Sequence, residues 1–108
     1  MKNKLIIDSL VLILSILAIV FFWENTLTTV IILLVLSVCI LIKTTKKEIL
    51  FFIIIATLAT LVESFTIFSG AWVYSSQQLI LVPIWLPLYW GIGGLIIKDI
   101  YLFLKKPK

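Results

Sequence analysis

The sequence predicts an all-α polytopic membrane protein in which four transmembrane helices form an antiparallel bundle. Of its 108 residues, 63% are hydrophobic and 13% are charged, and the mean hydropathy is +1.29. A soluble domain of this length could not cover so much apolar surface, whereas long apolar runs are typical of membrane helices. Short polar stretches separate the runs, so residues 1–108 are interpreted as a single transmembrane domain.

The basic residues are all lysines, nine in number, and they flank the apolar runs. In that position lysines act as topology signals, so we exclude nucleic-acid binding despite the net charge of +4. The chain has no histidine and a single cysteine, Cys39, which excludes a His/Cys metal site within one chain. We expect Cys39 to be a packing residue, and we expect no cofactor.

The first apolar run, residues 5–23, is long enough to span a hydrocarbon core at ~1.5 Å per residue. Its basic start resembles a signal peptide, but no small-residue cleavage site follows, so we expect it to remain as a helix. Thr26 is the expected N-cap of a second, shorter helix over residues 27–42. A polar loop, residues 43–48, then leads to a third helix over residues 49–68.

The fourth apolar segment, residues 79–104, is interrupted by prolines and glycines. It is either one helix broken or kinked by these residues, or a helix that begins at Pro83 after an extended stretch at 79–82. Proline suits the first helical position. If the helix is continuous, Pro87 leaves a backbone carbonyl about one turn earlier without its donor. The connection before this segment, residues 69–78, is the longest in the chain.

The placement of the lysines predicts the orientation. With four spans, all nine lysines fall on one side, and neither the first nor the third connection between helices contains a lysine. Because lysines are enriched on the cytoplasmic side, we expect a cell-membrane protein with both termini cytoplasmic. Four of the acids lie near helix ends, where we interpret them as topological or solvated: Asp8, Glu24, Glu48 and Asp99.

Glu63 lies inside an apolar run, and an intramembrane ionisable residue is a functional-site candidate by default. It is roughly 8 Å below the outer interface at ~1.5 Å per residue. Ala56, Thr60 and Ser64 recur beside it at i, i+4 and i+8. Small residues at this spacing let another helix approach closely, in this chain, in a second copy or in a partner subunit. Because burial disfavours the charged form of a carboxyl group, Glu63 is the candidate catalytic acid.

Aromatic residues form the expected walls of an outer-leaflet pocket around Glu63. Pockets for apolar ligands combine apolar walls with a few polar groups, and a tryptophan N–H below the interface needs an acceptor. The candidate substrate-binding residues flank the start of the fourth segment: Trp72, Tyr74, Trp85, Tyr89 and Trp90.

A structural interpretation of the same residues stays open. Interfacial tryptophans and tyrosines are more often belt residues than pocket walls, and prolines kink many membrane helices without forming a site. In this interpretation the Glu63 carboxylate only locks the bundle, by bonding Thr60, Tyr89 or Trp90.

The order Glu63, Gly70-x-Trp72-x-Tyr74, Pro83-x-Trp85-x-Pro87-x-x-Trp90 resembles the core of carotenoid hydratases of the bisanhydrobacterioruberin type. It is distantly similar to the small membrane subunits of heterodimeric lycopene cyclases, whose Pro-x-Glu-Glu motif is absent here. The resemblance covers about a quarter of the chain. It implies acid-assisted chemistry on a polyene within the membrane, with Glu63 as the acid.

Three classes of function follow from these observations. The first is binding, with or without modification, of an apolar lipid or an isoprenoid such as a carotenoid in the outer-leaflet pocket. The second is a non-catalytic accessory or assembly subunit of a membrane complex. The third is a transporter similar to small multidrug-resistance proteins, which have four helices but carry their essential glutamate in the first. Whether the protein is an enzyme stays open.

Overall fold

The computed structural model describes residues 2–42, 44–70, 72–74 and 82–105. These residues form four helices: α1 (Lys2–Phe22), α2 (Thr26–Leu41), α3 (Lys46–Phe68) and α4 (Leu86–Lys105). Among them α1, α3 and α4 are long and apolar enough to cross a membrane, whereas α2 is shorter, with 16 residues. The predicted fold class, an all-α polytopic membrane protein with four helices, is therefore confirmed.

Local capping chemistry sets the starts of α2 and α3, and both starts differ from the prediction. The first N–H groups of a helix have no intrahelical acceptor, so a side-chain oxygen just before the helix fixes where it begins. Asn25 caps α2 by accepting the Thr28 N–H at 3.1 Å, so the prediction of Thr26 is wrong. Thr45 caps α3 by accepting the Glu48 N–H at 3.3 Å, which places the helix start inside the predicted polar loop.

The start of α4 at Leu86 shows that the fourth segment is broken before this residue and that the helix does not begin at Pro83. Residues 75–81, which hold most of the preceding connection, lie outside the described residues, and residues 82–85 are not helical. Pro87 therefore lies in the first turn, where its missing N–H removes no intrahelical bond. α4 then continues from Leu86 to Lys105, and the Leu86 N–H donates to the Pro83 carbonyl at 3.1 Å.

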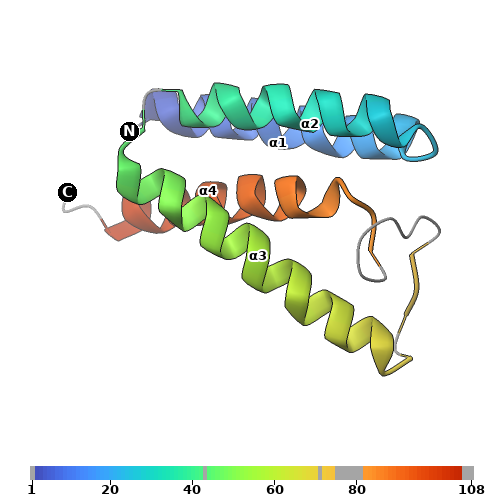
Figure 1. Cartoon of the computed structure of the whole chain (residues 1–108). Coiled ribbons are helices and arrows are strands. Elements are labelled where there is room, and N and C mark those ends of the chain that lie inside the picture. Colours follow the sequence, from blue (N-terminus) through green and yellow to red (C-terminus); the bar gives the residue numbers. More distant parts are fainter. Residues whose placement is uncertain (1, 43, 71, 75–81, 106–108) are drawn as a thin grey trace.

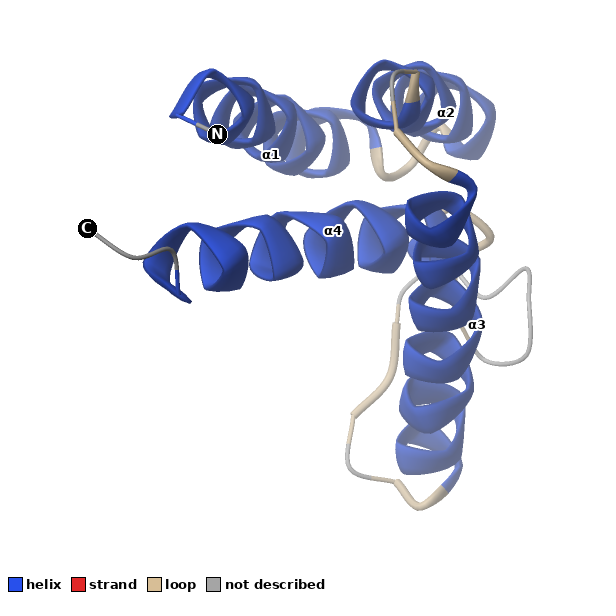
Figure 2. Ribbon diagram, turned by 90° about the vertical axis from the view of Figure 1, so that its left-hand side faces the viewer, coloured by secondary structure: helices blue, strands red, loops and turns tan. Residues whose placement is uncertain are grey.

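The helices are arranged around α4. Figure 1 shows α1 and α2 side by side as an antiparallel hairpin with α4 beneath them, and α4 contacts both helices of the hairpin. α3 packs extensively on α4 but diverges from α1 and α2 toward its C-terminal end (Figures 1 and 2). Several side chains of the α4 core and its neighbours are fully buried: Leu33, Ile92 and Leu95.

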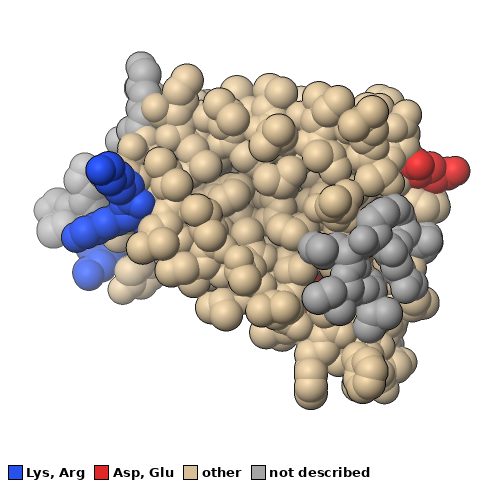
Figure 3. Space-filling model, viewed as in Figure 1, with Lys and Arg blue, Asp and Glu red and all other residues tan. Residues whose placement is uncertain are grey.

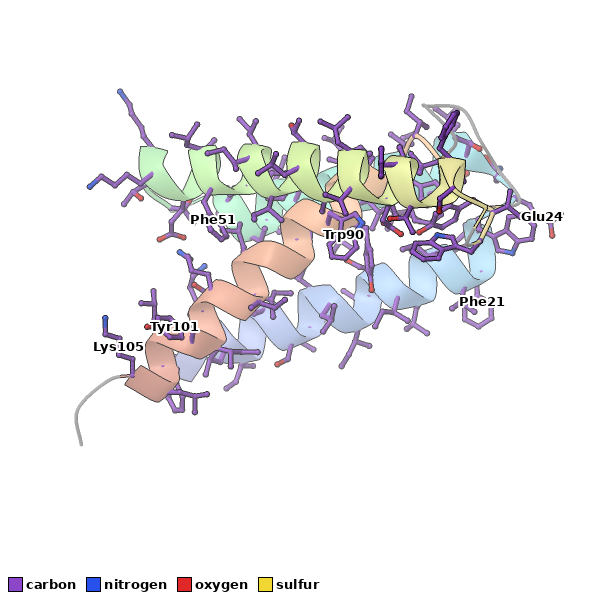
Figure 4. All side chains as sticks on the ribbon, turned by 90° about the horizontal axis from the view of Figure 1, so that it is seen from below. Phe21, Glu24, Phe51, Trp90, Tyr101 and Lys105 are labelled. Carbon is purple, nitrogen blue, oxygen red and sulfur yellow. The ribbon has the colours of Figure 1, made fainter. Side chains whose placement is uncertain are left out.

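Charge is segregated to the two ends of the molecule. The lysines visible in Figure 3 gather at the end that also holds both termini. Glu24, in the turn between α1 and α2, is exposed at the opposite end (Figure 4). Most of the surface between the two ends is formed by exposed Ile, Leu, Val and Phe side chains, which suits contact with lipid chains. We refer to the two ends as the lysine end and the Glu24 end.

Candidate functional site

Glu63 accepts two hydrogen bonds from side chains that are distant in the sequence. It lies in the last turns of α3. The Tyr74 hydroxyl, from the connection after α3, donates to Glu63 Oε1 at 2.7 Å. The Trp90 indole N–H, from the beginning of α4, donates to Glu63 Oε2. We call these three residues the Glu63 cluster; it ties the diverging end of α3 to the start of α4.

In the Glu63 cluster the Glu63 carboxylate acts as a hydrogen-bond acceptor. An ionised carboxylate accepts at both oxygens, and both oxygens have a donor here. Burial raises the pKa of Tyr74 well above its ordinary value, and the hydrogen bond to Glu63 raises it further, so the hydroxyl keeps its proton and remains a donor. This geometry is the one that the structural interpretation describes, in which Glu63 joins two segments of the bundle. Trp90 is one of the partners expected there, and Tyr74 is a partner that was not expected. The Thr60 hydroxyl is buried and has no hydrogen-bond partner among the described residues.

The face of α3 that carries small residues is buried inside the single chain. Among the described helices, α4 is its one extensive neighbour, and α4 provides glycines for the close approach. A Cβ at Gly91 would lie 2.5 Å from the Phe52 ring, and one at Gly94 would lie 2.7 Å from Ile55. The small residues that predicted such an approach are all buried: Ala56, Thr60 and Ser64.

The candidate substrate-binding residues are divided between two pockets that share none of their described lining residues. A pocket of about 480 Å³ is lined by Glu63, Trp72 and Trp90. A smaller one, of about 240 Å³, lies against the C-terminal half of α1. The remaining predicted walls line this smaller pocket: Tyr74, Trp85 and Tyr89. The aromatic residues therefore do not form one chamber around the carboxylate.

A larger groove, which the sequence did not predict, runs between α3 and α4 and has a volume of about 880 Å³. Trp90 and Ala59 line both this groove and the Glu63 pocket, so the two spaces adjoin. Glu63 itself does not line the groove. Figure 4 shows Trp90 close to the crossing of α3 and α4, with Phe51 and Tyr101 toward the lysine end. The groove is lined mainly by two helices: Phe51, Ile55 and Ala59 on α3, and Gly93, Ile97 and Tyr101 on α4.

A second group of polar residues, at the lysine end, joins α1, α3 and α4. Asp99 lies 3.4 Å from Lys4 and 3.6 Å from Lys98, and Lys98 lies 3.2 Å from Glu48. Asp8 lies 4.0 Å from Lys4 and beside the Asp99 carboxyl group, and neither of its carboxyl oxygens has a hydrogen-bond partner among the described residues. Asp8 and Asp99 are only 1% and 3% exposed. We call these five residues the charged cluster.

The sequence interpretation missed the charged cluster. Asp8 and Asp99 were assigned as topological or solvated residues because they lie near helix ends, and their burial shows that this is wrong. One signal was present in the sequence. Small or polar residues recur on one face of α1 at helical spacing, and in the structure that face is buried: Asp8, Val11, Ser15 and Ala18. A polar residue on such a face is directed into the bundle and not toward water.

Neither polar cluster is built as a metal site. Among the described residues, no group of three or more His, Cys, Asp or Glu side chains is placed to hold a metal ion. In the charged cluster, lysines supply the positive charge that a bound cation would otherwise provide. Cys39 is exposed on α2, so the interpretation of this residue as a packing residue is wrong.

Comparisons of the chain with models of protein families, with curated proteins and with solved structures found no match. Function is therefore inferred from the geometry of the groove and of the two polar clusters.

Proposed function

We propose that this small integral membrane protein binds the apolar chain of a lipid, of the acyl or isoprenoid class, in the groove between α3 and α4. A volume of about 880 Å³ lies in the range of small-molecule binding sites, which are mostly apolar with a few polar groups. The lining matches that description, because Lys98 is the only charged residue among the described residues that form it.

The observation that carries the proposal is the space at Gly93. Glycine in a helix interior costs about 1 kcal/mol relative to alanine, so a helical glycine needs a reason. At Gly94 the reason is packing, since a Cβ there would lie 2.7 Å from Ile55. A Cβ at Gly93 would have no neighbouring atom within 4 Å, and Gly93 lines the groove. No contact with another described residue accounts for Gly93, whereas a lipid chain lying along α4 does.

In this proposal Glu63 is a positioning residue. Its hydrogen bond holds the Trp90 indole, and Trp90 lines the groove. Catalysis by Glu63 acting as an acid, as the resemblance to carotenoid hydratases implies, would require Tyr74 or Trp90 to leave the carboxylate. Binding without chemistry needs no such rearrangement, and it is therefore the function that we propose.

We also propose that both termini lie in the cytoplasm and that Glu24 faces outward. The gathering of lysines at the lysine end, beside both termini, supports this orientation, because lysines are enriched on the cytoplasmic side of membrane proteins. Single cysteines, Glu24→Cys and Lys47→Cys, in a Cys39→Ser background report the orientation. An impermeant thiol reagent added to intact cells should label the first and spare the second. The opposite pattern would contradict the orientation.

Photolabelling of the purified protein in lipid nanodiscs tests the binding function. The probes are a phospholipid and a geranylgeraniol that each carry a diazirine in the chain. We expect labels on Phe51, Ile97 and Tyr101 in the groove, several-fold more than on exposed positions of α3 outside it, such as Leu50 and Ile54. Equal labelling of the two sets would contradict the proposal.

A series at Gly93 provides the matched variants. Gly93→Leu adds a side chain that points into the groove, so it should remove most labelling of the groove and leave labelling of Leu50 unchanged. Gly93→Ala should fold at least as well as the natural chain, because it gains helix propensity without a clash. Groove labelling that persists in Gly93→Leu would mean that the probes do not lie along α4.

A further inference from the structure

The two helices that form the groove each continue toward the lysine end with a lysine on the lining face. On α3 the lining residues Phe51, Ile55 and Ala59 repeat every four positions, and Lys47 is the preceding position in that series. Residues at i and i+4 lie on the same face of a helix. Lys47 is therefore placed where α3 leaves the groove, whereas its neighbour Lys46 begins a different face.

The same pattern occurs on α4 with the chain running in the opposite direction. Gly93, Ile97 and Tyr101 line the groove at intervals of four residues, and Lys105 is the next position in the series. The Lys105 ammonium lies 5.9 Å from the centre of the Tyr101 ring, so its side chain turns back toward the groove. Figure 4 shows Tyr101 and Lys105 together at the lysine end of α4.

No acidic side chain is left to neutralise these two lysines. The chain contains five acidic residues, and the structure describes all of them. Glu63 belongs to the Glu63 cluster and Glu24 lies at the opposite end. The other three acids belong to the charged cluster, where they pair with Lys4 and Lys98. Lys47 and Lys105 are exposed and form no ion pair with another described residue.

The length of the groove is that of one leaflet. Trp90 and Tyr101 are separated by about 16 Å along α4 at ~1.5 Å per residue, and half of a hydrocarbon core of about 30 Å is about 15 Å. A chain that starts at the lysine end would therefore reach Trp90 near the middle of the membrane. Its headgroup would lie at the level of Lys47 and Lys105.

We infer that the occupant of the groove is an anionic phospholipid of the leaflet at the lysine end, with its phosphate between Lys47 and Lys105. This inference rests on the proposed function and adds the headgroup, the leaflet and the direction of the chain. Charge complementarity selects the headgroup. Lys47 and Lys105 have no acidic partner among the described residues, whereas Lys98, the charged residue in the groove lining, is already paired with Glu48 and Asp99. The positive ends of the lysines bind phosphate oxygens, and the chain extends past Tyr101 and Gly93 toward Trp90.

The test compares lipids that share dioleoyl chains and differ in the headgroup. Native mass spectrometry of the detergent-purified full chain measures retention of phosphatidylglycerol, phosphatidylcholine and diacylglycerol. We expect phosphatidylglycerol to be retained most strongly and diacylglycerol least. Lys47→Gln and Lys105→Gln should each lower retention of phosphatidylglycerol about fivefold, since one lysine near an anionic surface contributes about that factor. Retention of diacylglycerol should not change in either variant.

Lys46→Gln is the matched control, because it removes the same charge from the same end of the molecule but from a different face of α3. We expect Lys46→Gln to lower retention of phosphatidylglycerol less than half as much as Lys47→Gln does. Equal effects at the two positions would overturn the assigned headgroup site, since general attraction to anionic lipid would then suffice. Equal retention of all three lipids, with loss of all three in Gly93→Leu, would overturn this inference and support the proposed function. Retention that Gly93→Leu leaves unchanged would overturn both.

Discussion

The two polar clusters hold opposite ends of α4 by different means. Near its start, Trp90 and the loop residue Tyr74 donate hydrogen bonds to a single carboxylate, Glu63. Near its end, Asp99 is held by two lysines and lies beside a second buried carboxyl group, that of Asp8. The Glu63 cluster uses neutral donors on rigid rings, whereas the charged cluster balances full charges.

This difference indicates what each end of α4 contributes. Hydrogen bonds from ring donors fix an orientation, and the Glu63 cluster thereby fixes the Trp90 ring beside the groove. Ion pairs between long lysine side chains and carboxylates neutralise charge more than they fix geometry. The charged cluster contains three acids and two lysines, so neutralisation of its carboxylates depends on each lysine. Single substitutions should therefore affect the two clusters differently.

The largest loss of stability is expected for Lys98→Met. This lysine contacts both Glu48 and Asp99, so its removal leaves three acids facing Lys4 alone. Removing one partner of a buried ion pair typically costs about 3 kcal/mol or more. Equilibrium unfolding in a mild detergent measures the loss. Lys46→Met is the control, because Lys46 is exposed, and its free energy of unfolding should change by less than about 0.5 kcal/mol. Similar values for the two variants would contradict a stabilising role of the charged cluster.

A smaller loss is expected for Glu63→Leu. This variant leaves the Trp90 N–H and the Tyr74 hydroxyl without their acceptor, which should cost about 2 kcal/mol in all. Glu63→Gln should cost less than about 1 kcal/mol. The glutamine oxygen can accept from Trp90, and its amide can donate to the Tyr74 oxygen, because a hydroxyl is both donor and acceptor.

Unfolding of the two Glu63 variants, followed by tryptophan fluorescence, tests whether the hydrogen bonds of Glu63 stabilise the packing of α3 on α4. If both variants are equally unstable, a negative charge at position 63 is required and the hydrogen bonds alone do not explain the cluster. If neither variant loses stability, the Glu63 cluster does not hold α3 to α4. We expect the free energy of unfolding to decrease from the natural chain to Glu63→Gln and from Glu63→Gln to Glu63→Leu.

The smallest effect, and one of opposite sign, is expected for Asp8→Asn. This variant leaves two acids and two lysines in the charged cluster and gives Asp99 a neutral amide neighbour that can donate a hydrogen bond. We expect the free energy of unfolding to stay the same or to rise by up to about 1 kcal/mol. Asp99→Asn is the contrasting variant, because Asp99 is in contact with both lysines, and it should destabilise. If Asp8→Asn lowers the free energy of unfolding as much as Asp99→Asn does, Asp8 is not the carboxyl group in excess in the charged cluster.

The apolar runs and the lysines between them were sufficient to predict the number of helices, their order and the fold class. Membrane helices must satisfy every backbone hydrogen bond within the segment, so composition and length alone identify them. Glu63 and Trp90 could also be singled out, because a carboxylate or an indole N–H in an apolar segment requires a partner. Local sequence was less informative at helix starts: Thr26 was the expected cap of α2, but the adjacent Asn25 provides it.

Tertiary structure decided which of these polar groups meet. The connection after α3 brings Tyr74 to Glu63, and the crossing of α1 with α4 brings Asp8 to Asp99; both contacts join residues far apart in the chain. The crossing of α3 and α4 also separates glycines that look alike in the sequence: Gly94 lies against Ile55, while Gly93 faces the groove. Periodicity places a residue on a face of its own helix. What that face meets depends on the angle and depth at which two helices pack, and those are set by all of their side chains together.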